Sequence, residues 1–397
     1  QEDKILQDVF DLVLLNVRVP NERRGDYMAQ IAANRLGNRR LTELFKKWSK
    51  KEIELGCSAI IDAVTRRMRI SIAELPDGEY KFEDVLDDDG MGTENIPVVV
   101  KIAKQGEEIW LDFEGSGRQV RGNMNNSFAG LQASVLFALK VLVDPDGPTN
   151  HGMLEPVHIK APDGSVVNAS FPAATAARAQ TCQRIIDVIL GALAEAVPDR
   201  VIAACNGANG VATFSGTGPD GKYYLYMETI GGGAGGRSYK DGSDGIQVHV
   251  TNTSNLPVEA LENEYPLLVD RYELIEGSGG AGKWRGGLGL RRVYRGLNHT
   301  LTFSGQGERA VKAPWGLFGG ESGGTASISL HYDDGKKESL AIKPASLEVE
   351  PNVAVCIETA GAGGYGPPAE RDIESLQDDA RSGKFNAEFM RKSSTLQ

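Results

Sequence analysis

The sequence predicts an α+β fold, in which a helical N-terminal arm is followed by a glycine-rich, mainly β region with a few packed helices. Over residues 1–75, apolar side chains recur at spacings of three and four, the period of an amphipathic helix. After Pro76, short runs rich in Val, Ile, Phe and Tyr alternate with turn residues, which is typical of strands. The chain contains 48 glycines, many of them beyond Val211, so many backbone positions there need positive φ or close approach.

The helical arm covers residues 1–75. One helix starts near Ile5 and ends before Pro20, a second starts at Asn21, and a third covers Glu52 to Arg69. Asparagine is a frequent N-cap residue, which supports the start of the second helix. Basic residues interleave with apolar ones along this arm. We interpret that pattern as a helix face that is solvated or packs on another subunit.

Residues 76–266 form a predicted α+β region. The runs VVVKIA and EIWLDFEG flank Lys104–Gly106, which predicts a β-hairpin with a glycine in its turn. The apolar pattern predicts a buried helix at Leu131 to Val143 and an amphipathic helix at Thr181 to Val197. Strands and glycine turns dominate the remainder of the region.

The last two parts of the chain are a β-rich region and a tail. The β-rich region covers residues 267–368, and the tail, residues 369–397, is helical and polar. In the tail we expect one helix at Ile373 to Ala380 and another around Asn386 to Arg391. No internal repeat of about 20 to 50 residues is apparent, which argues against a solenoid or propeller.

Composition and charge exclude several functional classes. With 41% hydrophobic and 24% charged residues, the chain is ordinary for a globular protein. A formal net charge of −11 argues against nucleic-acid binding, because a phosphate backbone needs a positive face. No apolar run reaches about 18 residues, and we find no basic-then-apolar leader. We therefore expect no membrane partner and a cytoplasmic location.

The four cysteines carry no sign of a metal site or of a disulfide framework. Their spacing matches neither a CxxC zinc site nor the dense pattern of a small secreted domain. We interpret them as reduced thiols that are mostly buried. They are Cys57, Cys182, Cys205 and Cys356.

Three blocks between Tyr223 and Leu290 carry a family resemblance. They read YYLYMETIGGGAGG, HVTNTSNLPVEALENEYPLLVDRYEL and GSGGAGKWRGGLGL. Together they resemble the hydantoinase B/oxoprolinase family. Further segments follow in the family's order, including NERRGDYMAQIAANRLGNRRL, AQTCQRIIDVILGALAEAVPDRV and APWGLFGGESG. The resemblance extends from about Leu12 to about Pro368.

The resemblance implies an ATP-dependent complex. Members of that family work with a hydantoinase A-type subunit that binds ATP, and together they open cyclic amides such as 5-oxoproline, hydantoins or lactams. Relatives carboxylate ketones such as acetone or acetophenone. The family's metal ligands lie in a further N-terminal portion, in motifs of the type NDPYxGGTH and NxxHHxD, and neither motif occurs here. We therefore expect this chain to be the C-terminal part of such a subunit, within a hetero-oligomer, and to bind neither the metal nor ATP and Mg²⁺ itself.

One segment imitates a phosphate-binding loop. Gly277 to Lys283 satisfies most of GxxxxGK[ST], but Trp284 follows, and a Trp supplies no hydroxyl for a Mg²⁺ ion. The sequence beyond it predicts a strand, whereas a phosphate loop opens a helix whose N–H groups face the anion. We interpret the segment as a structural loop, and the resemblance assigns ATP to the partner.

Glu228, His249 and Asn252 are the predicted catalytic residues. Glu228 lies among apolar residues in the strand-like run YYLYMETI, where an ionised carboxylate needs a partner or acts as a base. His249 ends the predicted strand Ile246 to Val250, and histidine moves protons near neutral pH. Asn252 belongs to the run of uncharged polar side chains that follows His249.

The predicted substrate-binding residues are Thr251, Asn255, Gly232 and Gly233. The first two have side chains suited to gripping an amide or a carboxylate. Asn255 has an alternative role as the N-cap of the helix PVEALENEY. The two glycines belong to a run after a predicted strand, where the bare backbone would pass close to a substrate or to the partner subunit.

Our hypothesis from the sequence is a subunit of an ATP-dependent cyclic-amide hydrolase. The first alternative is a subunit of an ATP-dependent ketone carboxylase, in which a phosphorylated enol attacks carbon dioxide. The second alternative is a noncatalytic scaffold that only assembles a complex. No residue in the sequence separates the first two, and a partner-dependent ATPase activity would separate both from the third.

Overall fold

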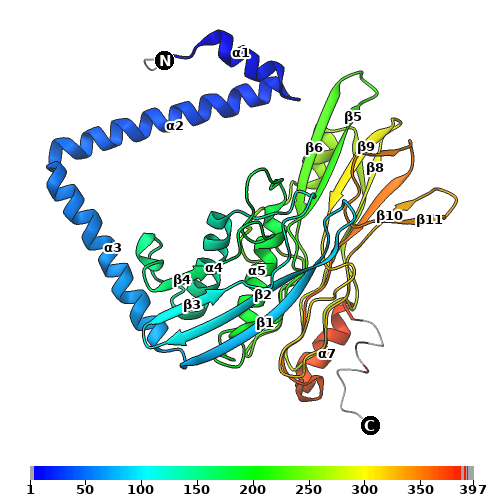
Figure 1. The fold of residues 1–397 in the computed structure, drawn as a ribbon. Coiled ribbons are helices and arrows are strands. Elements are labelled where there is room, and N and C mark those ends of the chain that lie inside the picture. Colours follow the sequence, from blue (N-terminus) through cyan, green and yellow to red (C-terminus); the bar gives the residue numbers. More distant parts are fainter. Residues whose placement is uncertain (1–3, 386–388, 390, 392–397) are drawn as a thin grey trace. The chain divides into compact units, whose positions relative to one another are not determined.

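A computed structural model describes residues 4–385, 389 and 391. The chain forms two compact units, divided between Ala63 and Val64. The first holds helices and the second holds helices and strands, so the fold is α+β (Figure 1). The finer division into four parts stays a prediction. None of the described helices is both long and apolar enough to cross a membrane.

The first unit consists of α1 (Gln7–Leu15), α2 (Pro20–Lys47) and the beginning of α3 (Lys50–Ala73). Proline occupies the first turn of α2, where its missing N–H removes no helical hydrogen bond. Phe10 of α1 contacts Tyr27 of α2 edge to face, with ring centroids 6.0 Å apart. Three helices therefore account for the helical pattern predicted from the sequence.

The second unit begins with a four-stranded sheet. Its order is β1-β2-β3-β4, with β3 and β4 parallel and the other pairs antiparallel. The predicted hairpin is confirmed, because Gln105 pairs with Glu108 across a turn in which Gly106 has φ of 58°. The strands are β1 (Gly78–Asp88), β2 (Glu94–Gln105), β3 (Glu108–Asp112) and β4 (Val157–Lys160).

One helix packs on this sheet and a second helix packs on the first. They are α4 (Phe128–Val143) and α5 (Arg178–Ala192), which contact each other, and α5 also contacts β1 and β2. Both predictions are confirmed, although each helix begins three residues before its predicted start. Gly191 allows the close approach of α5 to the sheet, because a Cβ there would lie 2.8 Å from the ring of Phe82.

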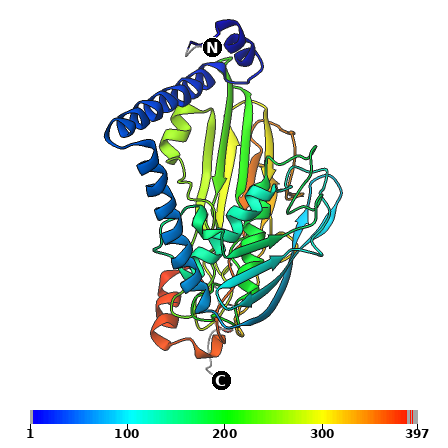
Figure 2. The ribbon, with the colours of Figure 1, turned by 60° about the vertical axis from the view of Figure 1, so that its left-hand side comes forward.

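A sandwich of two further sheets follows. One has the order β12-β9-β5-β6 and the other β11-β10-β13-β8-β7. Its core is aromatic, since the Phe214 ring lies 5.1 Å from that of Phe303 and 4.7 Å from that of Tyr294, between centroids. Figures 1 and 2 show the first sheet, in cyan, beside the sandwich. The elements are β5 (Gly210–Thr217), β6 (Tyr223–Ile230), α6 (Val258–Glu264), β7 (Leu267–Leu274), β8 (Leu290–Gly296), β9 (Leu301–Gln306), β10 (Ser327–His331), β11 (Lys337–Leu340), β12 (Leu347–Val349) and β13 (Ala354–Glu358).

Glycine-rich segments interlace between these layers. The backbone of Gly233 donates to Ala360 at 3.2 Å, and that of Gly287 donates to Ala234 at 2.8 Å. A Cβ on Gly233 would lie 2.1 Å from the carbonyl oxygen of Gly287, and one on Gly361 would lie 1.8 Å from that of Ser278. Only glycine fits where backbones pack this closely, which accounts for much of the glycine content.

The described part of the tail contains one helix. Helix α7 (Ile373–Ser382) confirms the first prediction there, and Asp372 caps it by accepting from the N–H of Ser375 at 2.8 Å. The second predicted helix, around Asn386 to Arg391, lies almost entirely outside the described residues. Two short 3₁₀ turns, η1 (His151–Met153) and η2 (Pro368–Glu370), complete the elements.

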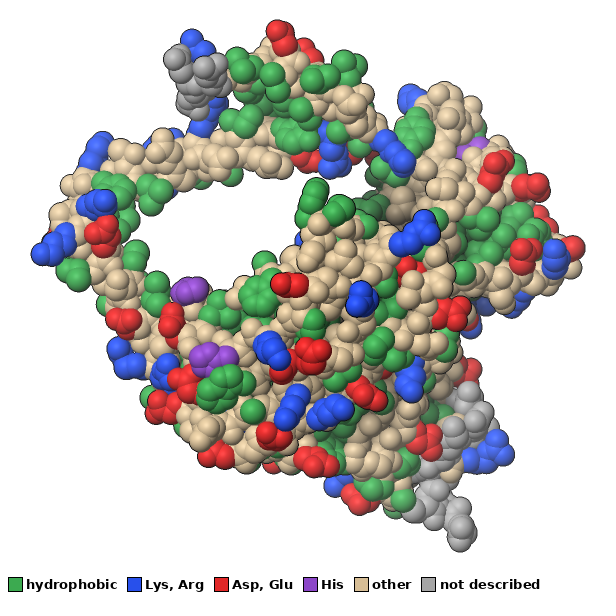
Figure 3. Space-filling model, viewed as in Figure 1, with side chains coloured by type: hydrophobic (Ala, Val, Ile, Leu, Met, Phe, Trp, Pro, Cys, Tyr) green, Lys and Arg blue, Asp and Glu red, His purple; other side chains and the backbone are tan. Residues whose placement is uncertain are grey.

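The surface mixes charges of both signs. On the face shown in Figure 3, acidic and basic side chains of the described residues alternate, and no broad basic patch appears among them. The overall balance is acidic, with a net charge of −11.

Candidate functional site

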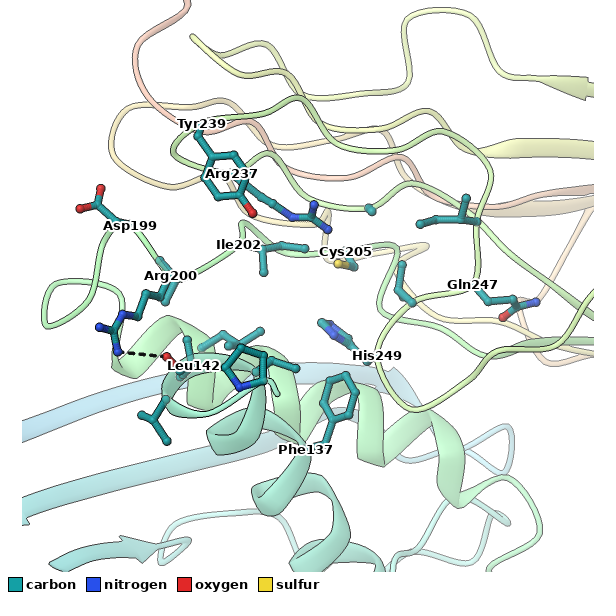
Figure 4. Close-up of a pocket in the computed structure, with 18 of the residues that line it drawn as sticks. Phe137, Leu142, Asp199, Arg200, Ile202, Cys205, Arg237, Tyr239, Gln247 and His249 are labelled. Atoms are coloured by element: carbon teal, nitrogen blue, oxygen red, sulfur yellow. Dashed lines mark hydrogen bonds between the residues drawn. The ribbon is translucent and has the colours of Figure 1, made fainter. Parts of the chain in front are cut away.

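A cavity of about 640 Å³ lies in the second unit, between helix α4 and the glycine-rich loops. Its volume is in the usual range for small-molecule sites. Helix α4 contributes Phe137 and Leu142, and the loops contribute Cys205, Arg237 and His249 (Figure 4). An apolar wall therefore faces a group of polar and ionisable side chains, the arrangement expected of a site that orients a small ligand.

His249 lies in a turn and not in a strand. The predicted strand Ile246 to Val250 is wrong: only an isolated bridge joins Ile246 to Gly232, and His249 has φ of 53°. Its side chain is 6% exposed and meets the edge of the Phe137 ring. The loops pair with one another at single residues because their glycines allow tight packing, so a regular strand does not form here.

Asp187 holds the imidazole of His249. Nε2 of His249 lies 3.0 Å from Oδ1 of Asp187, while Oδ2 of Asp187 accepts from Arg309 at 2.7 Å. Burial opposes ionisation, but the hydrogen bond from His249 and the charge of Arg309 hold the pKa of Asp187 below its usual value. The carboxylate therefore stays charged and fixes the ring.

Cys205 flanks the same imidazole. It lies in an extended segment, in which Ala204 donates to Trp315 and Asn206 donates to Gly233, at 3.0 and 2.9 Å. Burial alone would lower the pKa of His249, but the neighbouring Cys205 sulfur and the Asp187 carboxylate raise it to about 10. The ring is therefore protonated at neutral pH, between two groups that stabilise its charge.

The buried charges continue beyond Asp187. Nη1 of Arg309 lies 2.8 Å from Oδ2 of Asp84, although this nitrogen is not directed at the oxygen as in a hydrogen bond. Arg184 bridges Asp84 and Glu308, at 2.9 and 3.3 Å. Lys343 then contacts Glu308 at 2.6 Å and lines a second cavity of about 550 Å³. A continuous chain of ion pairs thus connects the two cavities.

Sequence reasoning missed Asp187, Arg184, Arg309 and Cys205. Helix α5 offered a signal, because Gln180, Arg184 and Asp187 recur at spacings of four and three, which places them on one face of the helix. All three are buried. A polar stripe on a buried helix requires partners inside the protein. Cys205 and Arg309 had no such signal, because their neighbours come from distant segments.

Two arginines approach the cavity. Arg200 binds Glu74 at 3.3 Å and the carbonyl of Leu142 at 3.4 Å, so its charge is shared. The guanidinium of Arg237 extends toward the side of the cavity where Cys205 lies (Figure 4). Within the part of the chain that the structure describes, no residue pairs with the Arg237 side chain. It is therefore available to an anionic group.

Glu228 lies away from this cavity, in the core of the sandwich. Its carboxylate accepts from Tyr226 at 2.6 Å, Tyr294 at 2.8 Å and Arg292 at 2.5 Å. The other oxygen accepts from the N–H of Leu256 at 3.2 Å. Glu228 and His249 thus do not share the cavity. The geometry favours a structural role for Glu228, and its predicted catalytic role is untested.

The polar run after His249 also lies outside the cavity lining. Asn252 is exposed, and Thr251 contacts only Thr253, at 3.5 Å between hydroxyls. Asn255 donates to the hydroxyl of Tyr272. Its alternative role as an N-cap is wrong, because α6 starts at Val258 after Pro257 and no side chain caps it. Substrate contacts by these residues stay predictions.

Gly232 and Gly233 face protein atoms. A Cβ on Gly232 would lie 2.3 Å from the Asn206 side chain, and Gly233 packs on the carbonyl of Gly287. Neighbouring Ala234 lines the cavity, and the N–H of Gly235 points at the Cys205 sulfur at 3.4 Å. Close packing accounts for both glycines, while the run as a whole forms one wall beside Cys205.

The segment Gly277 to Lys283, which imitates a phosphate loop, is one of the glycine-rich segments that pack between the layers. A Cβ on Gly279 would lie 2.2 Å from the carbonyl of Gly286, and one on Gly280 would lie 2.2 Å from that of Glu321. An isolated bridge follows at Trp284 where a phosphate loop would open a helix. Among the described residues, no three His, Cys, Asp or Glu side chains gather as a metal site.

Comparison with known proteins gives a family match and close structural neighbours. Residues 1–368 match the family described as hydantoinase B/oxoprolinase. An uncharacterized protein of Methanocaldococcus jannaschii is 38% identical over 96% of this chain, and the B-type subunit of a putative D-/L-hydantoinase from Pseudomonas sp. (strain NS671) is 32% identical over 96%. The chain spans 66% of the length of each, just under two thirds.

Two solved structures share the fold. The crystal structure of the ATP-dependent caprolactamase from Pseudomonas jessenii has a TM-score of 0.89 at 25% identity, covering 99% of this chain and 70% of the other. A nucleotide-free acetone carboxylase has a TM-score of 0.86 at 16% identity, covering 99% of this chain and 59% of the other. With the family match over residues 1–368, these findings show that the chain belongs to the hydantoinase B/oxoprolinase family.

Proposed function

We propose that this chain forms part of the hydantoinase B-type subunit of an ATP-dependent enzyme that hydrolyses cyclic amides. The observation that carries the proposal is the family match over residues 1–368. The names of relatives give the reaction class: one belongs to a D-/L-hydantoinase, and the neighbour with a TM-score of 0.89 is an ATP-dependent caprolactamase. The cavity beside His249 has the volume and polarity that a small ring requires.

The proposed reaction explains the need for ATP. A cyclic amide resists attack by water because resonance stabilises its C–N bond. A hydantoinase A-type partner transfers a phosphoryl group to the amide oxygen, which makes the ring carbon a far better electrophile. This chain encloses the activated ring: protonated His249 delivers a proton to the departing nitrogen, and Arg237 binds a negatively charged oxygen.

Cofactors and partners belong to the same proposal. ATP and Mg²⁺ bind to the A-type partner, and a divalent metal binds to a further N-terminal portion of the B-type subunit. The complete enzyme is thus a hetero-oligomer. The four cysteines of this chain are free thiols, which suits a reducing compartment such as the cytoplasm.

The test is a reconstituted complex. The full-length subunit is co-expressed with a hydantoinase A-type partner, and ADP release is measured with 5-oxoproline, hydantoins and lactams in turn. We expect ADP release that depends on one of these rings and matches the amount of ring-opened product. A complex that forms with the A-type partner and yet releases no ADP with any ring would contradict the proposal.

The same assay separates the two alternatives. Acetone carboxylase shares the fold of this chain, so a ketone with bicarbonate is the second substrate pair to offer. Carbon-14 from bicarbonate in an acid-stable product would support the carboxylase. A complex that assembles but consumes ATP with neither substrate class would support the scaffold.

A further inference from the structure

Three side chains from three separate segments form a line at the inner end of the cavity. Asp187 of α5 binds Nε2 of His249 at 3.0 Å, and the imidazole and Cys205 line the same cavity. Cys205 and His249 both line the cavity and lie next to each other in Figure 4. A nucleophile, an imidazole that exchanges protons and a group that orients the imidazole are the parts of covalent acyl transfer.

The Cys205 sulfur is enclosed by backbone groups and apolar side chains. The backbone N–H of Gly235 donates to Sγ at 3.4 Å, and the thiol also lies 4.0 Å from the carbonyl of Ala203. Apolar Ala234 and Val248 pack around it, and Cys205 has no surface open to bulk water. An electrophile therefore meets the sulfur only inside the cavity, where competing hydrolysis is limited.

The other buried cysteines lack this arrangement. Cys182 contacts the carbonyl of Gly130 at 3.9 Å, and burial raises its pKa. Cys356 lies on β13, and burial raises its pKa to about 11. Neither has an imidazole partner in the described structure, so each serves as a reference for a buried, unassisted thiol.

The backbone also holds the histidine in an uncommon conformation. His249 has φ of 53°, and Arg309, which binds the other oxygen of Asp187, has φ of 67°. Positive φ costs free energy in residues other than glycine, and it persists where surrounding contacts enforce it. His249 and Arg309 both have positive φ and both bind the Asp187 carboxylate. This indicates that the surrounding fold enforces the position of the imidazole.

We propose that Cys205 is the nucleophile of this site, that His249 exchanges its proton, and that Asp187 positions His249, so that the substrate acyl group is carried as a thioester. The inference rests on the proposed function, because the electrophile is the phosphorylated cyclic amide made by the ATP-binding partner. Asp187 touches only His249 and Arg309 in this scheme, and it acts by positioning.

Each step conserves atoms and electron pairs. The sulfur attacks the ring carbon, a C–S bond forms, and the C–O bond to phosphate breaks with its electron pair leaving on phosphate, which takes the thiol proton. Water then adds to that carbon and gives one proton to the ring nitrogen. As the ring C–N bond breaks, the nitrogen takes a second proton from His249, and the added hydroxyl returns a proton to His249 as it becomes the carbonyl of an open-chain thioester. A second water hydrolyses the thioester: its oxygen bonds to carbon, the C–S bond breaks, and its two protons go to the sulfur and to the free amine.

The first test is thiol labelling of the full-length subunit with iodoacetamide between pH 6 and 9, read by peptide mass spectrometry. Exposed Cys57 is the internal reference, and an unassisted thiol loses reactivity as pH falls. We expect Cys205 to react faster than Cys182 and Cys356, and His249→Gln to slow it at least about tenfold, without affecting Cys57. The proposal would be overturned if Cys205 were labelled as slowly as Cys182 and Cys356. It would also be overturned if His249→Gln left the labelling rate of Cys205 unchanged.

The second test uses turnover of the complex with its A-type partner. Cys205→Ser keeps the size of the side chain and should lower ring opening at least about 100-fold, as expected for loss of a nucleophile, whereas Cys182→Ser should not. During wild-type turnover, acid quenching should leave the acyl group on the Cys205 peptide. If Cys205→Ser turned over as fast as the wild type, Cys205 would not be the nucleophile, and the proposed function would be unaffected. If the wild type opens no ring, the proposed function fails, and labelling in the absence of the partner still decides the reactivity of Cys205.

Discussion

Two buried ion pairs in the second unit differ in what lies beside them. Glu228 and Arg292 are enclosed in the sandwich core, and the guanidinium lies 4.3 Å from the ring centroid of Tyr272. Asp187 and His249 are equally buried, but the imidazole borders a cavity of about 640 Å³. Burial with a charged partner is common to structural and functional sites, so contact with a cavity is the observation that separates them.

The largest effect is expected at the enclosed pair. Glu228→Ala leaves Arg292 buried without its charge partner, which should lower the free energy of unfolding by about 3 to 5 kcal/mol. Denaturant unfolding monitored by circular dichroism measures this change. Met227→Ala is the matched control, because Met227 is exposed on the same strand and should change stability by less than about 0.5 kcal/mol. A change below about 1 kcal/mol for Glu228→Ala would show that the pair is not structural.

At the cavity the expected effect is on turnover. His249→Ala should lower ring opening by the reconstituted complex by about 100-fold or more, the usual contribution of a proton-transfer group. The chain should still fold, because Asp187 keeps Arg309 as its partner. Activity and circular dichroism are measured on the same preparation. Wild-type turnover by a folded variant would remove His249 from the mechanism.

The pH dependence of stability sharpens the comparison. The pKa of His249 is raised to about 10 in the folded chain, by Cys205 and Asp187 against the opposing effect of burial. Its stabilising contribution is thus fully present below the unfolded pKa of about 6.5 and is lost as pH rises to about 10, by up to roughly 1.4 kcal/mol per pH unit. His249→Ala should show a shallower decline over that window in chemical denaturation. Parallel curves for the two proteins would contradict the assigned charge of the imidazole.

The smallest effect is expected from a hydroxyl at the enclosed pair. Tyr294→Phe removes one donor to Glu228, at 2.8 Å, while Tyr226 and Arg292 remain. The loss should be about 1 kcal/mol, the net value of one hydrogen bond, measured by denaturant unfolding. A loss above about 3 kcal/mol would mean that the pair depends on the complete set of donors.

Much of the fold could be predicted because its signals are local. Helices α4, α5 and α7 follow from apolar periodicity, and the hairpin of β2 and β3 follows from a glycine turn between alternating strands. The strand predicted at Ile246 to Val250 failed because the loop backbone bonds to Gly232 at one position and then turns. Pairing between loops depends on close glycine packing, which strand propensity does not measure.

The candidate site was predicted only in part. His249 lines the cavity, but Glu228, which was expected to act with it, belongs to the sandwich. Asp187 belongs to a helix predicted to be amphipathic, in which a polar residue is expected to face solvent, although Asp187 is buried. Asp187 lies 62 positions before His249 in the sequence, and Arg309 lies 60 positions after it. No local sequence pattern indicates contacts over such separations.

Residue types and short spacings were enough to predict the family, the α+β class and the glycine content that allows backbones to pack together. Which polar residues meet became visible only in the folded chain. The tertiary structure placed Cys205 beside His249, paired His249 with Asp187, and moved Glu228 away from both. The physical reason is that buried charges are satisfied by partners from distant segments, and burial and packing select those partners only when the chain folds.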